Sequence, residues 1–380
     1  MWLTTPVPGD HQVLADVATG QRGSAWAVGF DQDDPNSDYY GPAAYTYQDA
    51  GWKPVTAGLP INTRLDGVDT SDAGVFSVGE EMRYQPDGQP GYHHLAVRWD
   101  GSTWHKERVP QPSGADFYSR LVAVDALSSG EAWAVGNSSS YTDDTDRRGV
   151  LMHRAASGRW EQIKDPAITA AGDLNAVLAL SRRNIWAVGQ KAGSYDQPSI
   201  LRYDGHTWSK ADLPELPGDL AILESIAGTP HNLWAVGYTY TQGSGEQPLA
   251  LHYDGHTWKR VPTPGDSARL TGVTVSGDRA YAVGYATPDT ADINLTIGKP
   301  TPPGRSKTTS ASQPGQISFY GLILTPAGSQ PMDTPPQSGS GTLSGIDTDH
   351  CGRLWTVGNE DDKDGNNLPY AAHTDASNKR

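Results

Sequence analysis

A tetrapeptide made of an aromatic residue, a small residue, valine and glycine recurs along the chain, and it limits the possible folds more than any other feature. The copies read WAVG, FSVG, YAVG or WTVG and start at Trp26, Phe76, Trp133, Trp186, Trp234, Tyr281 and Trp355. Successive copies start 50, 57, 53, 48, 47 and 74 residues apart. Such a period, built from short segments of β-forming residues, is typical of small sheets repeated around an axis.

A complete repeat carries the signals of four strands. A Leu-x-x-Val or Leu-x-x-Ile segment begins 11 or 12 residues before the aromatic residue, which predicts a hairpin with a short turn. A third apolar run ends in Asp-Gly, as in Leu249–Gly255, and a fourth segment opens on Trp, as at Trp258. We therefore predict one all-β domain over residues 1–380, a seven-bladed β-propeller of four-stranded antiparallel blades.

The two ends of the chain are expected to share the last blade. The seventh repeat has a third strand near Leu368–Thr374 but no fourth, and Trp2–Asp10 matches Trp258–Asp266 at five positions with identical spacing. An N-terminal strand that joins the last blade would close the ring and leave no open sheet edge.

The repeat resembles that of kelch proteins, in which an aromatic and apolar strand ends in glycine and a Tyr-Asp and Trp hairpin follows. Asp100-Gly-Ser-Thr-Trp104, Asp204-Gly-His-Thr-Trp208 and Asp254-Gly-His-Thr-Trp258 also resemble the Asp-box of sialidase-type propellers, although they lack its leading serine. Similar repeats look common among actinobacterial propellers. The resemblance implies the fold and no particular reaction, because propellers host many unrelated functions.

Composition narrows the classes of partner. The chain has a formal net charge of −15 with 29 basic residues, so we expect no nucleic-acid partner. It has no apolar stretch long enough to span a membrane, and its lone cysteine, Cys351, excludes an internal disulfide and a metal cluster built on several cysteines. A closed ring needs no partner for its stability, so we expect a monomer.

The sequence is compatible with two cellular locations. The acidic balance and the many Gly, Tyr and Trp residues suit a secreted or cell-surface protein, yet the sequence carries no signal peptide, and a cytoplasmic protein is the alternative. Residues 286–315, rich in Pro, Thr, Ser and Lys, are expected to form a flexible insertion in blade six. This insertion is either a disordered segment without a role or a lid over the axial channel.

The long loops between second and third strands are the expected binding surface, because variable loops on a rigid scaffold commonly carry function. Tyrosines gather in or beside these loops and supply rigid contact area for a ligand. The alternative is that they anchor the loops. The tyrosines that we assign to ligand binding are Tyr40, Tyr118, Tyr141, Tyr238 and Tyr285.

Three arginines precede the repeat leucine, namely Arg64, Arg120 and Arg269, and could reach the mouth of the axial channel. They suggest a carboxylate, sulfate or phosphate ligand, and Arg–Asp bridges between adjacent blades are the alternative reading. Acidic residues lie nearby, and as candidates for a general base we name Glu224, Asp66 and Asp173.

Three loops alternate acidic residues in a way that suggests calcium, which prefers oxygen ligands. The candidate ligands are Asp31, Asp33, Asp362 and Asp364. None of the loops has the full spacing of a helix-flanked calcium loop, and solvated acidic turns are the alternative.

Three hypotheses for function follow. The first is a propeller that binds a glycan or another polar small molecule, anionic ones included, on its long-loop face. The second is an enzyme, a lyase, hydrolase or cyclase of a secondary-metabolite or polysaccharide pathway, with its site at the channel mouth. The third is a platform for protein partners.

Overall fold

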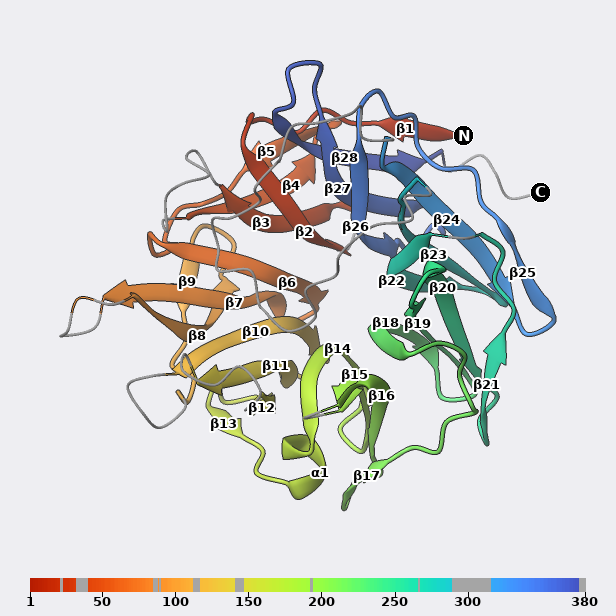
Figure 1. Cartoon of the computed structure of the whole chain (residues 1–380). Coiled ribbons are helices and arrows are strands. Elements are labelled where there is room, and N and C mark those ends of the chain that lie inside the picture. Colours follow the sequence, from red (N-terminus) through yellow and green to blue (C-terminus); the bar gives the residue numbers. More distant parts are fainter. Residues whose placement is uncertain are drawn as a thin grey trace.

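The structure, a computed structural model, consists of antiparallel sheets arranged around a common axis as in a β-propeller (Figure 1). It describes residues 1–380 except 21–22, 32–39, 85–87, 89, 112–116, 141–146, 192–193, 266, 289–315 and 376–380. Most of the expected insertion at 286–315 therefore lies outside the described residues. Within the described part, no helix is long and apolar enough to cross a membrane.

Five sheets have four strands, and one sheet has eight. The first sheet contains β2 (Gln12–Thr19), β3 (Ala25–Asp31), β4 (Gly41–Gln48) and β5 (Gly51–Pro54). The eight-stranded sheet contains β6 (Thr63–Ser71), β7 (Gly74–Tyr84), β8 (Pro90–Trp99), β9 (Trp104–Lys106), β10 (Phe117–Ala126), β11 (Ala132–Ser140), β12 (Arg148–Arg154) and β13 (Trp160–Gln162). The next sheet contains β14 (Ala171–Ser181), β15 (Asn184–Lys191), β16 (Ser194–Tyr203) and β17 (Trp208–Lys210).

Three further sheets complete the fold. One contains β18 (Leu220–Thr229), β19 (Asn232–Thr241), β20 (Gly245–Tyr253) and β21 (Trp258–Val261). Another contains β22 (Ala268–Ser276), β23 (Arg279–Ala286), β24 (Ser318–Thr325) and β25 (Gly328–Pro331). The remaining one contains β1 (Trp2–Thr4), β26 (Gly341–Thr348), β27 (Leu354–Asp361) and β28 (Asn367–Thr374).

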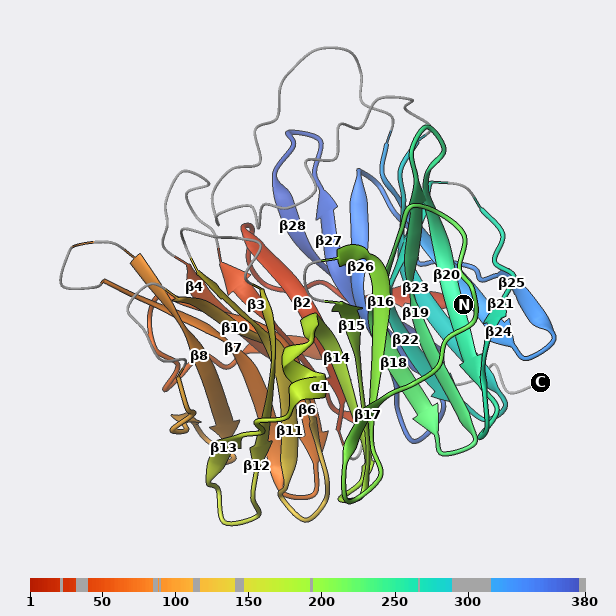
Figure 2. The same ribbon diagram turned by 60° about the horizontal axis from the view of Figure 1, so that its bottom comes forward.

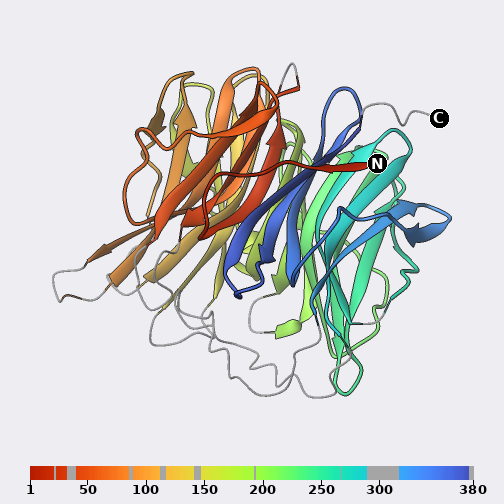
Figure 3. The same ribbon diagram turned by 90° about the horizontal axis from the view of Figure 1, so that it is seen from above.

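The first and last parts of the chain pair with each other. Strand β1 runs antiparallel to β28, with Trp2 opposite Thr374 and Thr4 opposite Ala372. Figure 3 shows the N-terminal strand lying against the strands from the end of the chain. The indole of Trp2 adds a hydrogen bond of 2.6 Å to the backbone oxygen of Asp333, so this segment is fixed by its side chain as well as by its backbone.

The repeated aromatic residues form the core between neighbouring sheets. Phe76, Trp186, Trp234 and Trp355 expose no more than 2% of their surface. Trp186, for example, packs within one cluster with Leu223, Leu233 and Leu251 of the following sheet. Their positions in mid-strand make them packing residues, since each removes roughly 150–250 Å² from water when buried.

The glycine of each repeat is required by a β-bulge. In every sheet the pairing of the first and second strands shifts just after the repeat leucine, as between Leu223 and Ser225. The glycine opposite lies so close that a Cβ on Gly237 would stand 2.0 Å from the backbone oxygen of Ile222. No other residue fits there, and the extra residue of the bulge turns toward the axis of the ring.

One element was not predicted. Residues Pro166–Thr169 form a short helix, α1, with Asp165 as its N-cap and Pro166 in its first turn. It lies beside β12 and β14 at the outside of the ring (Figure 2). A helix of one turn leaves no periodic pattern in a sequence, which explains why only its cap could have indicated it.

Candidate functional site

A cavity of about 290 Å³ runs along the axis of the ring. Residues of the first strand of every unit line it, from β2, β6, β10, β14, β18, β22 and β26. The bulged residue of each of these strands is among them, including Asp66, Asn175 and Glu224. The bulge therefore directs these side chains to the axis. We call the end of the cavity at which the bulged residues Asp66, Asn175 and Glu224 lie the long-loop mouth.

The charged residues of the lining are all acidic. Six acidic residues line the cavity, and no Lys, Arg or His is among its lining residues. The six are Asp16, Asp66, Asp69, Asp125, Glu224 and Asp347. Removing so many carboxylates from bulk water costs free energy. We therefore expect these groups either to be compensated by hydrogen bonds or to serve a function.

Four of these residues connect neighbouring inner strands. Asp69 accepts a hydrogen bond of 2.7 Å from the backbone N–H of Ala126, and Asp125 accepts one of 2.8 Å from that of Ala179. Asp16 accepts one of 2.9 Å from Val68, and Asp347 binds Thr19 in the same manner. These contacts tie together inner strands that share no backbone ladder.

Burial dominates the electrostatics of this lining. Desolvation raises the pKa of Asp16 to about 7 and that of Asp125 to about 6, while backbone N–H groups act in the opposite direction. Desolvation and the neighbouring Asp125 carboxylate hold the pKa of Asp69 well above its ordinary value. Protons therefore stay on this cluster at pH values at which exposed carboxyl groups have lost them.

Arg64 and Arg120 lie together beside the long-loop mouth. Nε of Arg64 lies 2.6 Å from Oδ1 of Asp66, and Nε of Arg120 lies 2.9 Å from Oδ2 of the same carboxylate. Arg120 and Asp66 come from β10 and β6, so the Arg–Asp bridge between units, one of the two readings of the sequence, is present here. The phenol of Tyr118 hydrogen-bonds to buried Glu80, and desolvation is the main cause that raises the pKa of both groups.

Arg269 belongs to a second cluster, on β19, β20, β22 and β23. It forms an ion pair with Glu246, with Nε 2.5 Å from Oε2. Its guanidinium lies over the ring of Tyr238, 4.1 Å from the centroid, and 5.9 Å from that of Tyr285. Two of the predicted tyrosines thus gather around one predicted arginine.

Glu224, on β18, lies at the edge of the second cluster and differs from the other acidic residues there because its carboxyl group is not paired within the described part of the chain. It is half-buried, it lines the axial cavity, and no described residue hydrogen-bonds to its carboxyl group. Desolvation raises its pKa, with Asp173 and Glu246 adding to the effect and Arg269 opposing it. It is the acidic group at the long-loop mouth that is open to a ligand or to proton transfer.

Asp173 is engaged by its neighbours. Nη1 of Arg147 lies 2.5 Å from Oδ2 of Asp173, and the amide of Gln190 donates to the same oxygen at 2.6 Å.

Tyr40 is buried and packs edge-to-face on Phe30, with 5.2 Å between the ring centroids. The guanidinium of Arg64 lies over the ring of Phe30, 4.3 Å from its centroid, so Tyr40 packs against the ring that supports Arg64.

The acidic loops are described only in part. Asp33 and Tyr141 lie outside the described residues. Oδ1 of Asp362 accepts hydrogen bonds from the backbone of Asp364 and Asn366 at 2.8 and 2.9 Å, so it shapes its own turn. Oδ2 of Asp31 accepts one of 2.7 Å from Gln12. The calcium site therefore stays a prediction.

Several residues of the site were not singled out from the sequence. The partners Glu80, Arg147 and Glu246 come from second or third strands or from loop ends, where nothing marks them. Asp69, Asp125 and Asp347 did leave a signal, because each is the fourth residue after a repeat leucine.

Comparison with known proteins supports the fold. No protein-family model and no curated protein matches the chain. Among solved structures it is similar to a streptogramin B lyase, with TM-score 0.55 and 12% identity over 98% of this chain and 97% of the other. It is also similar to the β-propeller domain of the Trilobed protease from Pyrococcus furiosus, with TM-score 0.52 and 9% identity over 97% and 98%. For the Trypanosoma rangeli sialidase the values are 0.51 and 9% over 97% and 57%. At these identities the likeness shows a β-propeller and nothing of the chemistry.

Proposed function

We propose that the protein is a seven-bladed β-propeller that binds a glycan at the long-loop mouth of its axial cavity. The blade count follows if the eight-stranded sheet represents two blades. A single parallel residue pair, Tyr118 with Tyr92, joins its halves. Strand β1 then supplies the fourth strand of the seventh blade and closes the ring.

The observation that carries the proposal is a difference in pairing. The three predicted arginines are each paired with a carboxylate, whereas the carboxyl group of Glu224 has no hydrogen-bond partner among the described residues. Glu224 offers an open carboxyl group beside Arg269, Tyr238 and Tyr285. Hydroxyl groups of a sugar can both donate to a carboxylate and accept from a guanidinium, and the half-buried ring of Tyr285 offers apolar contact to the face of a sugar, while buried Tyr238 supports Arg269 from below. The cluster thus combines the donors, acceptors and surfaces that a glycan needs.

An anionic ligand fits less well. Arg64 and Arg120 share Asp66, and Arg269 is paired with Glu246. An anion would have to displace one of these carboxylates and would face a cavity lined by acidic groups. Breaking a largely buried ion pair is costly, so a neutral sugar is the better candidate.

Catalysis is the second candidate, and a specific observation favours it. The pKa of Glu224 is raised by desolvation, and its carboxyl group faces a cavity without a hydrogen-bond partner among the described residues. A carboxyl group in this state holds its proton to higher pH than an exposed carboxyl group does, and it is free to take or give that proton. In that case Glu224 would be the general acid or base, with Arg269 positioning the substrate.

Thermal-shift screening with neutral sugars, amino sugars and sugar acids tests the proposal, because a ligand of the folded protein raises its melting temperature. We expect neutral sugars to be among the stabilising compounds and Glu224→Gln and Arg269→Ala to weaken their binding at least tenfold. The exposed residues Glu215 and Arg260 provide matched controls, and Glu215→Gln and Arg260→Ala should bind as the wild type does.

The alternatives give different results. Stabilisation by sugar acids alone, lost in Arg120→Ala and Arg269→Ala, would favour the anionic ligand. Conversion of a bound sugar by the wild type, abolished in Glu224→Gln with binding retained, would establish the enzyme. Binding that is unaffected by Glu224→Gln and by Arg269→Ala would contradict the assigned site.

A further inference from the structure

The turn between β26 and β27, at the opposite end of the ring from the long-loop mouth, carries a cluster of metal-binding residue types. Asp349, His350 and Cys351 follow one another in this turn, and one ligand atom of each lies within 4.8 Å of the others. Sγ of Cys351 is 3.2 Å from Nε2 of His350, and both residues are exposed. Among the described residues it is the one group of this kind.

The turn is held in a fixed shape by Asp349. Oδ1 of this buried carboxylate accepts hydrogen bonds from the backbone N–H groups of Cys351 and Arg353 at 2.9 and 3.0 Å. Oδ2 pairs with Nε of Arg353 at 2.6 Å, and the backbone N–H of Gly352 donates to the Asp349 carbonyl at 2.8 Å. Gly352 has a φ of +78°, which this tight turn requires. The two exposed donors therefore project from a backbone that is already ordered.

The donor geometry fits a tetrahedral metal ion. With Zn–S and Zn–N bonds of about 2.3 and 2.0 Å, two ligands of a tetrahedral site stand roughly 3.5 Å apart. The observed separation of 3.2 Å between sulfur and nitrogen needs only a small rotation of either side chain to match. Thiolate and imidazole together select zinc and similar borderline-soft ions over calcium or magnesium.

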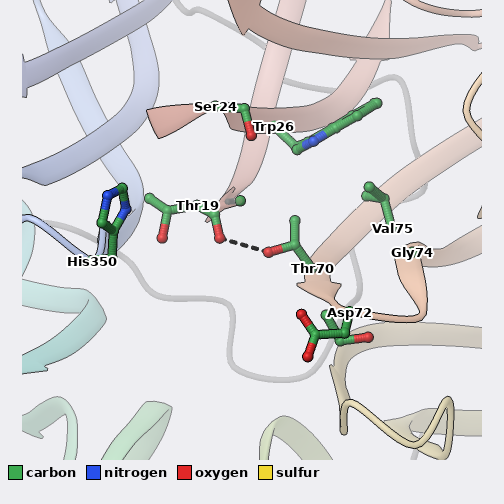
Figure 4. A pocket seen from close by; sticks show the side chains of 10 residues that line it. Thr19, Ser24, Trp26, Thr70, Asp72, Gly74, Val75 and His350 are labelled. Atoms are coloured by element: carbon green, nitrogen blue, oxygen red, sulfur yellow. Dashed lines mark hydrogen bonds between the residues drawn. The ribbon is translucent and has the colours of Figure 1, made fainter. Parts of the chain in front are cut away.

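Space for further ligands lies next to the cluster. His350 lines a pocket of about 750 Å³ together with Thr19, Ser24, Thr70 and Asp72. Figure 4 shows the imidazole of His350 on one side of this pocket, with the hydroxyl of Thr70 hydrogen-bonded to the backbone of Thr19. A metal ion at His350 would thus have room for water or for a small polar ligand.

We propose that His350 and Cys351 bind one Zn²⁺ ion, that Asp349 positions their turn, and that the pocket leaves the remaining coordination positions open to solvent. On binding, the thiol S–H bond breaks, a Zn–S bond forms, and the proton passes to the buffer. The site is separate from the glycan site and does not depend on it. The short turns of the other sheets contain no cysteine, so the proposal concerns this turn alone.

Titration of the reduced, metal-free full chain with Zn²⁺ against a chromophoric chelator tests the proposal. We expect one equivalent to bind, release of about one proton per ion near neutral pH, and at least a tenfold loss of affinity in His350→Ala and in Cys351→Ser. His231 lies in the corresponding turn between β18 and β19 and is exposed, so His231→Ala is the matched control and should bind as the wild type does.

Co²⁺ gives a second readout that identifies the sulfur ligand. We expect a near-ultraviolet thiolate-to-cobalt charge-transfer band with the wild type and with His231→Ala, and none with Cys351→Ser. Both substituted residues are exposed, so circular dichroism should show unchanged folding. A wild type without this band, or equal Zn²⁺ affinity in wild type and Cys351→Ser, would overturn the proposal.

Discussion

The carboxylate of Asp347 binds both the backbone N–H and the hydroxyl of Thr19, each at 2.7 Å, across a sequence separation of 328 residues. These hydrogen bonds join the inner strand of the last sheet to that of the first, β26 to β2. Asp69 and Asp125 make the corresponding contact to the inner strands that follow them, β10 and β14. A hydrogen bond to a buried carboxylate thus recurs at the axis, where neighbouring inner strands share no backbone ladder.

The loss of this contact should destabilise the ring. Asp347→Ala leaves the N–H of Thr19 without its acceptor, and an unsatisfied buried group costs about 1–3 kcal/mol. We expect a loss of this size in urea unfolding. Asp278 lies in an exposed turn, so Asp278→Ala should unfold as the wild type does. Equal stability of Asp347→Ala and Asp278→Ala would contradict a role for the contact.

Asp16 should make stability depend on pH. Desolvation raises its pKa to about 7 from the ordinary value of 3.8, so the folded protein holds this proton more tightly than the unfolded chain does. Its contribution is complete below pH 4 and is lost as the pH rises through about 7, with a slope of up to about 1.4 kcal/mol per pH unit.

Comparison of unfolding free energies between pH 4 and 8 isolates this effect. We expect Asp16→Asn to lose less stability than the wild type over this range, by up to about 4 kcal/mol. Exposed Asp10 provides the control, and Asp10→Asn should follow the wild-type profile. Parallel profiles for Asp16→Asn and the wild type would show that Asp16 does not keep its proton.

The repeat glycines should not tolerate a side chain. A Cβ on Gly237 would overlap the backbone oxygen of Ile222, whereas one on Gly51 would meet no atom within 4 Å. We expect Gly237→Ala to lose roughly 3 kcal/mol or more, or to fail to fold, since the clash involves backbone. Gly51→Ala should have nearly wild-type stability in the same denaturation assay. A stable Gly237→Ala protein would exclude the bulge geometry.

Asp66 should contribute more to the stability of the fold than Arg120, its partner in an ion pair. Removal of Asp66 leaves the guanidinium groups of Arg64 and Arg120 without their shared carboxylate, while removal of Arg120 leaves Asp66 paired with Arg64. Breaking a buried pair costs about 3–5 kcal/mol when a charge is left uncompensated. We expect Asp66→Ala to be clearly less stable than Arg120→Ala in urea, and the opposite order would contradict the shared pairing.

Much of the architecture could be predicted from the sequence, because packing requires the same types of residue at the same position of each repeat. Buried aromatic residues and bulge glycines recur at fixed spacing, and the match of Trp2–Asp10 to Trp258–Asp266 indicated the pairing of β1 with β28. The small residues near the axis also have a clear reason. Gly345 leaves room for the side chain of Asp16, whose carboxyl oxygen would lie 3.0 Å from a Cβ at that position.

The candidate site was only partly predictable. The arginines stood out by their repeat position, but their partners did not, because Glu246 lies 23 residues from Arg269 and Asp66 lies 54 from Arg120. Which carboxyl groups are paired depends on the bulges and on contacts between sheets. Only the folded structure separates Glu224, which is open, from Asp173, which is engaged.

The central claim is that a glycan binds at the long-loop mouth. A crystal structure of the protein with the sugar that raises its melting temperature most tests this claim directly. We predict that the sugar lies within hydrogen-bond distance of Glu224 and Arg269, at the end of the axial cavity. A sugar bound only on the short-turn face, or only on the outer edge of a sheet, would contradict the account.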